Sequence, residues 1–341
     1  MIEKNETEIM KDWAYIEPPL LTVASVTFNH ENYISESLDG ILMQETDFPF
    51  EIIVHDDCST DNTAKIIEEY AKKFPTIIKP ILQKENQYSK GVKVFTFIEE
   101  KILGEYVAIC EGDDYWIDPN KLQIQLDEMR KVENCNLSFH SAIVVWEDKS
   151  KKDGIISKQA NSNKIFTTSE VIKGDGGFCP TVSLIYKKEI GENLPEWYSK
   201  APFGDYFMQI LGSVRGGALY IDRSMAVYRG NTPGSWSEGR SKVETREKQV
   251  KQLMKTMDEM DRYFDNKFHP EIMQIKSHWY YELARAYLQN NDFKKFNQTI
   301  SKSYHMAEKK SKKLLLNFYL RNFPLLLQYM GKLNKYLVSK R

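Results

Sequence analysis

The first 110 residues alternate between two patterns of apolar side chains. Short, β-branched runs predict buried strands, and the segments between them place apolar residues at helical spacing. Strands are expected over residues 20–28, 51–55, 77–82 and 106–110, and helices over residues 34–44 and from about residue 64 to Pro75. This order predicts an α/β unit with a mainly parallel sheet, whose ligands bind beyond the carboxyl ends of its strands.

The rest of the chain shows two further patterns. Residues 136–229 are less regular, with strand-like pieces and a short helical stretch from Asp205 to Leu211, and we interpret them as an antiparallel extension of the sheet. Helical periodicity then dominates residues 243–264, 271–290 and 293–308. We therefore expect an N-terminal lead over residues 1–19, an α/β domain over residues 20–240, and a helical C-terminal region over residues 241–341.

Composition places this chain among ordinary globular proteins. Hydrophobic residues make up 41% of the 341 residues and charged residues 28%, which excludes disorder as the main state. The four cysteines are too widely spaced for a paired metal site or a dense disulfide framework. The N-terminus lacks the apolar core of a signal peptide, and no run of 18 apolar residues occurs. We expect a cytoplasmic protein.

The net charge of −1 hides an uneven distribution. Nine bases and no acid lie between Lys309 and Arg341, which leaves 38 bases against 48 acids in the preceding residues. Leucines and aromatic residues stand among the tail bases, interrupted by Pro324, so one or two basic amphipathic helices are expected. Such helices bind an anionic membrane interface, which would place the protein peripherally at the inner face of the cell membrane, or they pack on protein. We expect no nucleic-acid partner.

Adjacent aspartates follow two of the predicted strands. Asp56 and Asp57 come directly after residues 51–55, and Asp113 and Asp114 follow residues 106–110 by three positions. Neighbouring carboxylates repel one another, and a divalent cation bound through oxygen ligands would offset the repulsion. The alternative is that these residues only form turns or cap helices. Two such pairs at one edge of the same sheet favour a cation and ligand site.

Three ordered motifs carry a family resemblance. The runs Val23–Asn29, Ile52–Thr63 and Glu111–Trp116 resemble the family 2 glycosyltransferases, and the match covers about residues 20–235. The resemblance implies a GT-A, Rossmann-like, nucleotide-diphospho-sugar transferase domain, here with a C-terminal α-helical appendage. It also implies a nucleotide-sugar donor, most often UDP-linked, and Mn²⁺ or Mg²⁺ on the donor diphosphate. Hard oxygen ligands suit these ions.

The same resemblance implies roles for individual residues. Thr27 and Phe28 would flank the nucleobase and ribose, with Asn29 in the same donor loop, and Asp57 would accept a hydrogen bond from the base. Asp113 and Asp114 correspond to the metal and ribose motif, and Asp114 is expected to be the direct metal ligand. A cation on the diphosphate stabilises the negative charge that develops as the sugar bond breaks.

The candidate general base lies in the middle region. Pro202–Phe207 resembles the family segment in which an aspartate deprotonates the acceptor hydroxyl, so Asp205 is the candidate. Its alternative role is a helix N-cap. His140 is expected to be structural.

The family's closing loop resembles residues 225–237. There Asn231 stands near the position of a common family histidine, as a candidate metal ligand or phosphate contact. Arg229 pairs either with donor phosphate or with a structural carboxylate. Trp116 and Trp236 are either sugar platforms or core residues.

The residues and the resemblance together predict an inverting glycosyltransferase. It would move a sugar from a nucleotide donor to a hydroxyl of a glycan or lipid-linked glycan, in synthesis of a bacterial surface polysaccharide or glycoconjugate. Two alternatives remain open: a nucleotidyltransferase on a similar sheet, and a catalytically silent sugar-binding or scaffolding module. Against the nucleotidyltransferase, the loop from Thr27 to Tyr33 contains no glycine, lysine or arginine.

Overall fold

The computed structural model describes residues 2–232 and 242–339. The chain forms two compact units: Met1–Leu194 with Asp205–Glu238, and Pro195–Gly204 with Gly239–Arg341. Trp236, one of the predicted sugar platforms, lies outside the described residues together with the end of the predicted closing loop.

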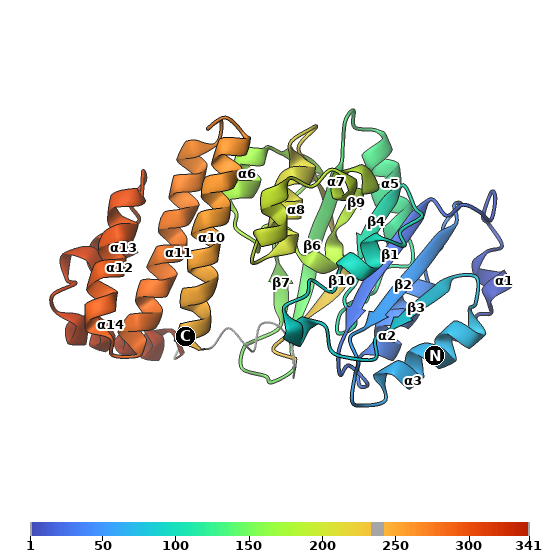
Figure 1. The fold of residues 1–341 in the computed structure, drawn as a ribbon, viewed down its shortest axis with the longest axis horizontal. Coiled ribbons are helices and arrows are strands. Elements are labelled where there is room, and N and C mark those ends of the chain that lie inside the picture. Colours follow the sequence, from blue (N-terminus) through green and yellow to red (C-terminus); the bar gives the residue numbers. More distant parts are fainter. Residues whose placement is uncertain (1, 233–241, 340–341) are drawn as a thin grey trace. The chain divides into compact units, whose positions relative to one another are not determined.

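The parallel half of the first unit matches the sequence prediction. Four strands lie side by side in the order β3-β2-β1-β4 and all pair in parallel (Figure 1). The central residues of these strands are buried, as expected of a parallel sheet covered by helices, except in the edge strand β3, where Lys79 and Pro80 are exposed. Their bounds are β1 (Leu21–Thr27), β2 (Phe50–Asp56), β3 (Ile78–Leu82) and β4 (Tyr106–Ile109).

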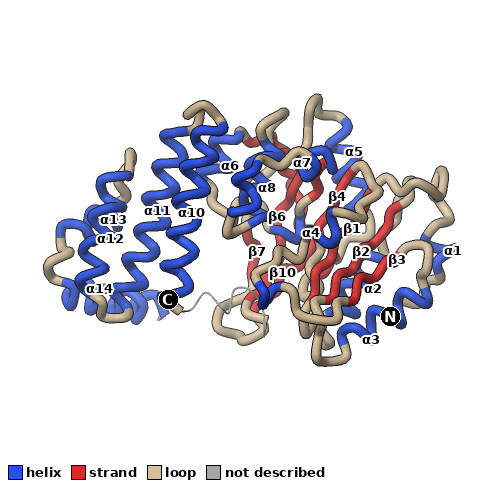
Figure 2. The backbone as a smooth tube through the Cα atoms, viewed as in Figure 1, coloured by secondary structure: helices blue, strands red, loops and turns tan. Residues whose placement is uncertain are grey.

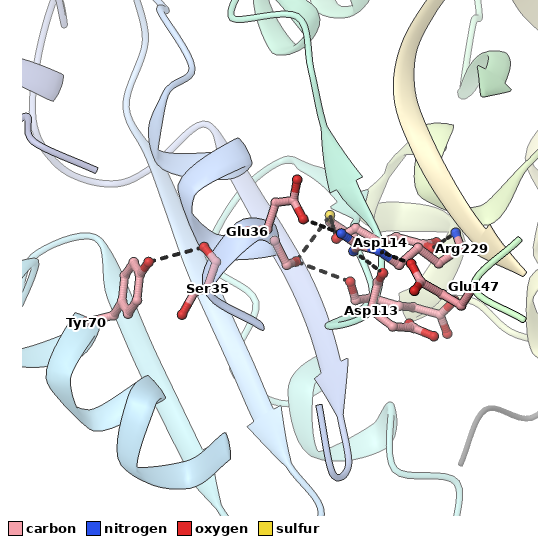
Figure 3. Close-up of polar contacts among 10 residues, drawn as sticks. Ser35, Glu36, Tyr70, Asp113, Asp114, Glu147 and Arg229 are labelled. Carbon is pink, nitrogen blue, oxygen red and sulfur yellow. Dashed lines mark hydrogen bonds and ion pairs between the residues drawn. The ribbon is translucent and has the colours of Figure 1, made fainter. Parts of the chain in front are cut away.

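Two helices complete the βαβ crossovers. Helix α2 (Ile34–Leu42) buries an apolar face that includes Leu38 and Ile41, and α3 (Thr63–Lys73) buries Ile67 and Tyr70. The Tyr70 hydroxyl donates to the backbone oxygen of Ser35, which ties the two helices together (Figure 3). These crossovers hold the carboxyl ends of β1 and β2 in register, with Thr27 opposite Asp56.

The other half of the sheet differs from the prediction. It continues through β9 (Ile185–Lys187), β6 (Leu137–Trp146), β10 (Ala218–Gly230) and β5 (Tyr115–Trp116). Strand β9 is antiparallel to both β4 and β6, but β10 runs parallel to β6. The expected antiparallel extension is therefore wrong for the β6–β10 pair. Because one antiparallel strand separates β4 from β6, the long strands β6 and β10 point the same way as β1 and β4.

Short elements connect these strands in the first unit. The helices are α1 (Glu6–Ile9), α4 (Thr96–Glu99), α5 (Lys121–Arg130), α6 (Thr168–Lys173), α7 (Lys188–Glu192) and α8 (Gly204–Ser213). Two 3₁₀ turns span Tyr88–Lys90 and Thr181–Ser183, and two short strands, β7 (Gly154–Ile156) and β8 (Lys164–Phe166), pair with β6 and β10.

The second unit is helical in its described residues (Figure 2). After a 3₁₀ turn over Glu196–Lys200 it contains α10 (Val243–Tyr263), α11 (His269–Gln289), α12 (Phe293–Met306), α13 (Lys312–Tyr319) and α14 (Pro324–Ser339). The three long helices agree with the predicted helical segments. Pro324 begins α14, where its missing N–H costs no hydrogen bond, so the tail forms two helices.

Two basic side chains are buried in the core of the first unit. Lys121 and His140 are both 0% exposed. The Lys121 amine lies 4.0 Å from the ring centroid of Trp116 and has no hydrogen-bond partner among the described residues. Burial lowers the pKa of Lys121 to about 7 and that of His140 to about 3. His140 is therefore a core residue, as predicted.

Candidate active site

The three predicted polar loops meet at the carboxyl edge of the parallel strands. The Asp57 N–H donates to the Thr27 carbonyl oxygen at 3.0 Å, and the Gly112 N–H donates to the Val26 carbonyl oxygen at 2.9 Å. A Cβ atom on Gly112 would lie 2.7 Å from the Thr27 side chain, so only glycine permits this close approach. The loops after β1, β2 and β4 therefore form one continuous surface.

The donor side of this edge is built from hydrogen bonds between loops. The Asn29 side-chain oxygen accepts the Thr60 N–H at 2.8 Å, and the Asn29 N–H donates to Ser59. Phe28, between Asn29 and the strand end, is partly exposed. The Thr27 hydroxyl is buried and has no partner among the described residues, so it remains able to bond a ligand or water.

Asp57 holds the neighbouring 3₁₀ turn. Its two carboxylate oxygens accept the backbone N–H groups of Gln87 and Tyr88 at 2.8 and 2.9 Å. Its backbone oxygen also accepts the Asn86 amide at 3.0 Å. In this state Asp57 therefore shapes the wall of the donor side, and its predicted contact with a nucleobase stays a prediction.

The loop after β4 concentrates negative charge. Burial raises the pKa of Glu111 to about 8, and the charges of Asp113 and Asp205 act in the same direction. Glu111 was missed by the sequence reasoning, which considered only the aspartate pair. Its position directly before Gly112, where the backbone passes close to Thr27, was the available signal.

Asp113 and Asp114 have different surroundings. Asp113 is partly exposed, and one of its oxygens accepts the Thr232 hydroxyl at 2.6 Å. Asp114 is 1% exposed, and one of its oxygens accepts the Arg229 backbone N–H at 2.9 Å while the other has no partner among the described residues. Burial raises the pKa of Asp114, and the charges of Asp113 and Glu111 add to the shift.

Arg229 fastens this acidic loop to its surroundings (Figure 3). Its guanidinium donates to the Asp113 carbonyl oxygen at 2.7 Å, to Glu147 at 3.1 Å, and to Glu36. The group also lies over the ring of Tyr115, 4.4 Å from the centroid. Of the two alternatives that the sequence left open, the structure shows pairing with carboxylates, and a contact with donor phosphate stays a prediction.

Asp205 lies in the first turn of α8. One of its oxygens accepts the Thr181 hydroxyl at 3.0 Å, and the other accepts the N–H of the next residue, Tyr206. The helix begins at Gly204, so Asp205 lies inside it and is not an N-cap residue. Burial raises the pKa of Asp205, which increases its affinity for a proton.

Tyr228 was also missed by the sequence reasoning. It lies near the end of β10, partly buried, directly after the two residues that pair with β5. Burial raises the pKa of its phenol, and four surrounding carboxylates add to the shift: Asp114, Glu111, Asp113 and Asp205. The structure therefore brings the acidic loop and the candidate base together around one tyrosine.

Two other predicted residues lie away from this cluster. The Asn231 amide donates to Asp148 at 3.0 Å, and its neighbour Thr232 contacts Asp113 instead. The predicted role of Asn231 as a metal ligand stays a prediction. Trp116 is 1% exposed, with its indole N–H donating to the Val182 carbonyl oxygen at 3.0 Å, so it belongs to the core.

The acidic loop fits a divalent cation shared with a ligand. No group of three or more His, Cys, Asp and Glu side chains within residues 2–232 and 242–339 is arranged as a metal site. Mg²⁺ on a nucleotide needs only one or two carboxylates, because phosphate oxygens and water supply the other ligands. The mutual repulsion of Glu111 and Asp113 and the unpartnered oxygen of Asp114 match that requirement.

This fold and this site define a class of protein. The mixed sheet with polar loops at its carboxyl edge, together with the C-terminal helices, is a GT-A fold with a helical appendage. The sequence profile of glycosyl transferase family 2 matches residues 22–192, half of the chain. The chain belongs to glycosyl transferase family 2.

Known proteins agree with this assignment. The crystal structure of Staphylococcus aureus TarS residues 1–349 in complex with UDP-GlcNAc has the same fold, with a TM-score of 0.62 and 16% identity over 90% of this chain and 87% of that one. An uncharacterized protein of Mycobacterium tuberculosis is 34% identical over 218 residues, 63% of this chain and 60% of the relative. The putative teichuronic acid biosynthesis glycosyltransferase TuaG of Bacillus subtilis is 28% identical over 51% of this chain and 65% of its own. The chain thus spans about 60% of the length of the Mycobacterium tuberculosis relative.

Proposed function

We propose that this protein is an inverting glycosyltransferase that moves a sugar from a UDP-sugar to a hydroxyl of a glycan acceptor in synthesis of a bacterial surface polysaccharide or glycoconjugate. The observation that carries the proposal is the presence of two acidic groups in one site. Burial raises the pKa of Asp205, and the charge of Asp205 acts on Glu111 in the acidic loop, as the charge of Asp113 does. Asp205 would take the proton of the acceptor hydroxyl, and the acidic loop would bind a cation on the donor diphosphate. A binding module without turnover would not need both.

Donor and acceptor classes rest on different support. The fold shared with TarS, which was solved with UDP-GlcNAc, supports a UDP-sugar in the space bordered by Thr27, Phe28 and Asp57. The similarity to TuaG, a putative teichuronic acid biosynthesis glycosyltransferase, supports a surface polysaccharide as the acceptor. The unpartnered Thr27 hydroxyl would bond the nucleoside.

The proposed reaction is a single displacement. The acceptor hydroxyl gives its proton to Asp205 as its oxygen forms a bond to the anomeric carbon. The bond from that carbon to the diphosphate breaks on the opposite face, and the nucleoside diphosphate leaves with the electron pair, so the configuration inverts. Thr181 holds the Asp205 carboxylate through its hydroxyl at 3.0 Å. A bound Mn²⁺ or Mg²⁺, held by Asp113 with Asp114 or Glu111, would stabilise the diphosphate charge.

The test uses the full chain and a defined set of donors. UDP-GlcNAc, UDP-glucose and UDP-galactose are each added with Mn²⁺, and UDP release and thermal stabilisation are measured. Asp205→Asn should lower the rate of UDP release by about 10²- to 10⁴-fold, because the general base is lost. It should keep the donor-dependent rise in melting temperature, because a ligand that binds the folded state stabilises it.

Asp222→Asn is the matched control. Asp222 lies on β10 beside Tyr220 and is not among the charges that shift the pKa of Asp205 or Glu111. This variant should release UDP at the unmodified rate. Full activity of Asp205→Asn would remove Asp205 from the mechanism, and the absence of stabilisation by every donor would contradict the proposed donor class.

A further inference from the structure

Helix α14 in the second unit turns a set of large apolar side chains toward solvent. Between Leu325 and Leu333, five of them are 37–67% exposed, and we name these five the apolar face of α14: Leu325, Leu326, Tyr329, Met330 and Leu333. Single exposed apolar residues are normal on protein surfaces, but a contiguous group of this kind marks an interaction site.

The spacing of these residues makes them one stripe. They occupy positions i, i+1, i+4, i+5 and i+8 of a helix, which lie on the same side at 3.6 residues per turn. Lys332 borders the stripe and is exposed. The helix is therefore amphipathic, with its apolar side turned outward.

The opposite side of α14 is already used by the fold. Leu327 is 6% exposed, and the Gln328 amide donates to the Leu288 carbonyl oxygen at 2.6 Å and to Asn291 at 2.8 Å. These contacts fix the rotation of α14 about its axis. The apolar face is therefore held outward by specific hydrogen bonds to the end of α11 and the turn after it.

The chain segment that carries the apolar face has charges of one sign. Nine basic residues and no acid occur from Lys309 to Arg341, and Lys309, Lys310, Lys312 and Lys313 are exposed at the start of α13 and just before it. A second copy of this chain would bring two such basic segments together, which like-charge repulsion opposes. An anionic surface is the complementary partner.

Length decides between lying on a membrane and crossing it. Helix α14 has 16 residues, and within the described part of the chain no helix combines the length and apolarity that a bilayer span requires. A short amphipathic helix with lysines beside an apolar face lies in the plane of the interface instead. Its lysines then approach the phosphates of anionic lipids.

We propose that α13 and α14 form a peripheral membrane anchor that binds anionic lipid bilayers, with the apolar face of α14 inserted between headgroups and the lysines of α13 on lipid phosphates. This inference stands on the second unit alone and does not depend on the proposed sugar transfer. It would hold the enzyme at a membrane surface.

The test measures binding of the full chain to vesicles. Vesicles of phosphatidylcholine with one third phosphatidylglycerol should bind the protein at low salt, and pure phosphatidylcholine vesicles should bind at least about tenfold more weakly. The double variant Leu325→Ser with Tyr329→Ser should weaken binding to the anionic vesicles by at least about tenfold, because the inserted apolar area is lost. Lys312→Gln with Lys313→Gln should weaken it and reduce its dependence on salt.

Leu103→Ser is the matched control, because Leu103 is a single exposed leucine, 63% exposed, in the first unit. It should bind vesicles as the unmodified protein does. Equal binding to both vesicle types, or unchanged binding of the Leu325 and Tyr329 variant, would overturn the proposal. A dimer in light scattering that the same variant dissociates, without vesicle binding by the unmodified chain, would assign the apolar face to self-association. UDP-sugar stabilisation of each variant is measured separately, so the two proposals fail independently.

Discussion

Two of the regions in the first unit that bury titratable side chains differ in whether a solute can reach them. The acidic loop with Asp205 lies at the carboxyl edge of the sheet, where Glu111, Asp113 and Asp205 are all partly exposed. The basic pair of Lys121 and His140 is 0% exposed. Burial disfavours the charged form of the side chains in both regions. It raises the pKa of Glu111 and Asp205, and it lowers the pKa of Lys121 and His140.

The difference explains why only one region is a candidate site. Repulsion in the acidic loop is relieved when a cation and a diphosphate arrive from solution, because the carboxylates of Glu111 and Asp113 are partly exposed. The Lys121 amine lies 4.0 Å from the centroid of the Trp116 ring, and His140 is 0% exposed, so each group lowers its cost of burial by losing its proton. A cluster of like charges therefore indicates a ligand site when solvent reaches the cluster. A cluster that solvent does not reach lowers the stability of the fold.

Among the tests of this comparison, the largest effect is expected for Asp113→Asn, which would break the acidic loop as a cation site. Asparagine keeps an oxygen that accepts the Thr232 hydroxyl, so the loop should keep its shape. Loss of the charge should lower Mn²⁺-dependent UDP release by about 10²- to 10³-fold, the usual cost of one electrostatic stabiliser. Initial rates over a Mn²⁺ titration measure the effect. Asp127→Asn, on the surface of α5, is the control, and an equal loss there would discredit the assignment.

A second test separates stability from function at the same edge. Glu111→Gln should stabilise the ligand-free protein at pH 8 by an amount on the order of 1–3 kcal/mol, while lowering donor binding. The sign follows from the pKa, which burial raises to about 8 in the folded protein, above its ordinary value of 4.5. The unmodified protein therefore loses stability as pH rises from about 4.5 to 8, and the variant does not. Urea unfolding at pH 5 and pH 8 measures the difference.

Glu105→Gln is the matched control for that test, because Glu105 is exposed just before β4. It should show the same pH dependence of stability as the unmodified protein. If Glu111→Gln follows that pH dependence too, Glu111 carries no buried charge penalty, and the comparison between the two regions loses its basis.

Sequence reasoning located the edge but not all of its residues. The apolar runs of β1 to β4 and the acids that follow them are local signals, and the parallel order of these strands follows from the helices between them. The direction of β10 beside β6 depends on pairing between residues about 80 positions apart, which periodicity does not record. That part of the sheet was therefore predicted with the wrong orientation.

The site shows the same limit. Asp113 was found because adjacent acids after a buried strand are unusual, and Asp205 was found because Pro202–Phe207 resembles a family segment. Tyr228 has the pattern of any aromatic residue in a buried strand, and only the folded structure reveals the carboxylates around it. Arg229 was ambiguous because its partners Glu36 and Glu147 lie 193 and 82 residues away in the chain.

The smallest effect tests the closed region, and its pH dependence should have the opposite sign. His140 has a pKa of about 3 in the folded protein, lowered by burial and by the nearby charge of Lys121, against 6.5 ordinarily. The unfolded chain therefore binds a proton that the folded protein refuses, so the stability present above pH 6.5 falls as pH falls. The loss should reach about 2 kcal/mol at pH 5, and His140→Gln should abolish that part of the slope.

The exposed His278→Gln is the control. Urea unfolding from pH 7 to pH 5 measures how the free energy of unfolding changes with pH. An unchanged slope in His140→Gln would show that solvent or a buried anion reaches the basic pair. The distinction between an open acidic edge and a sealed basic core would then fail.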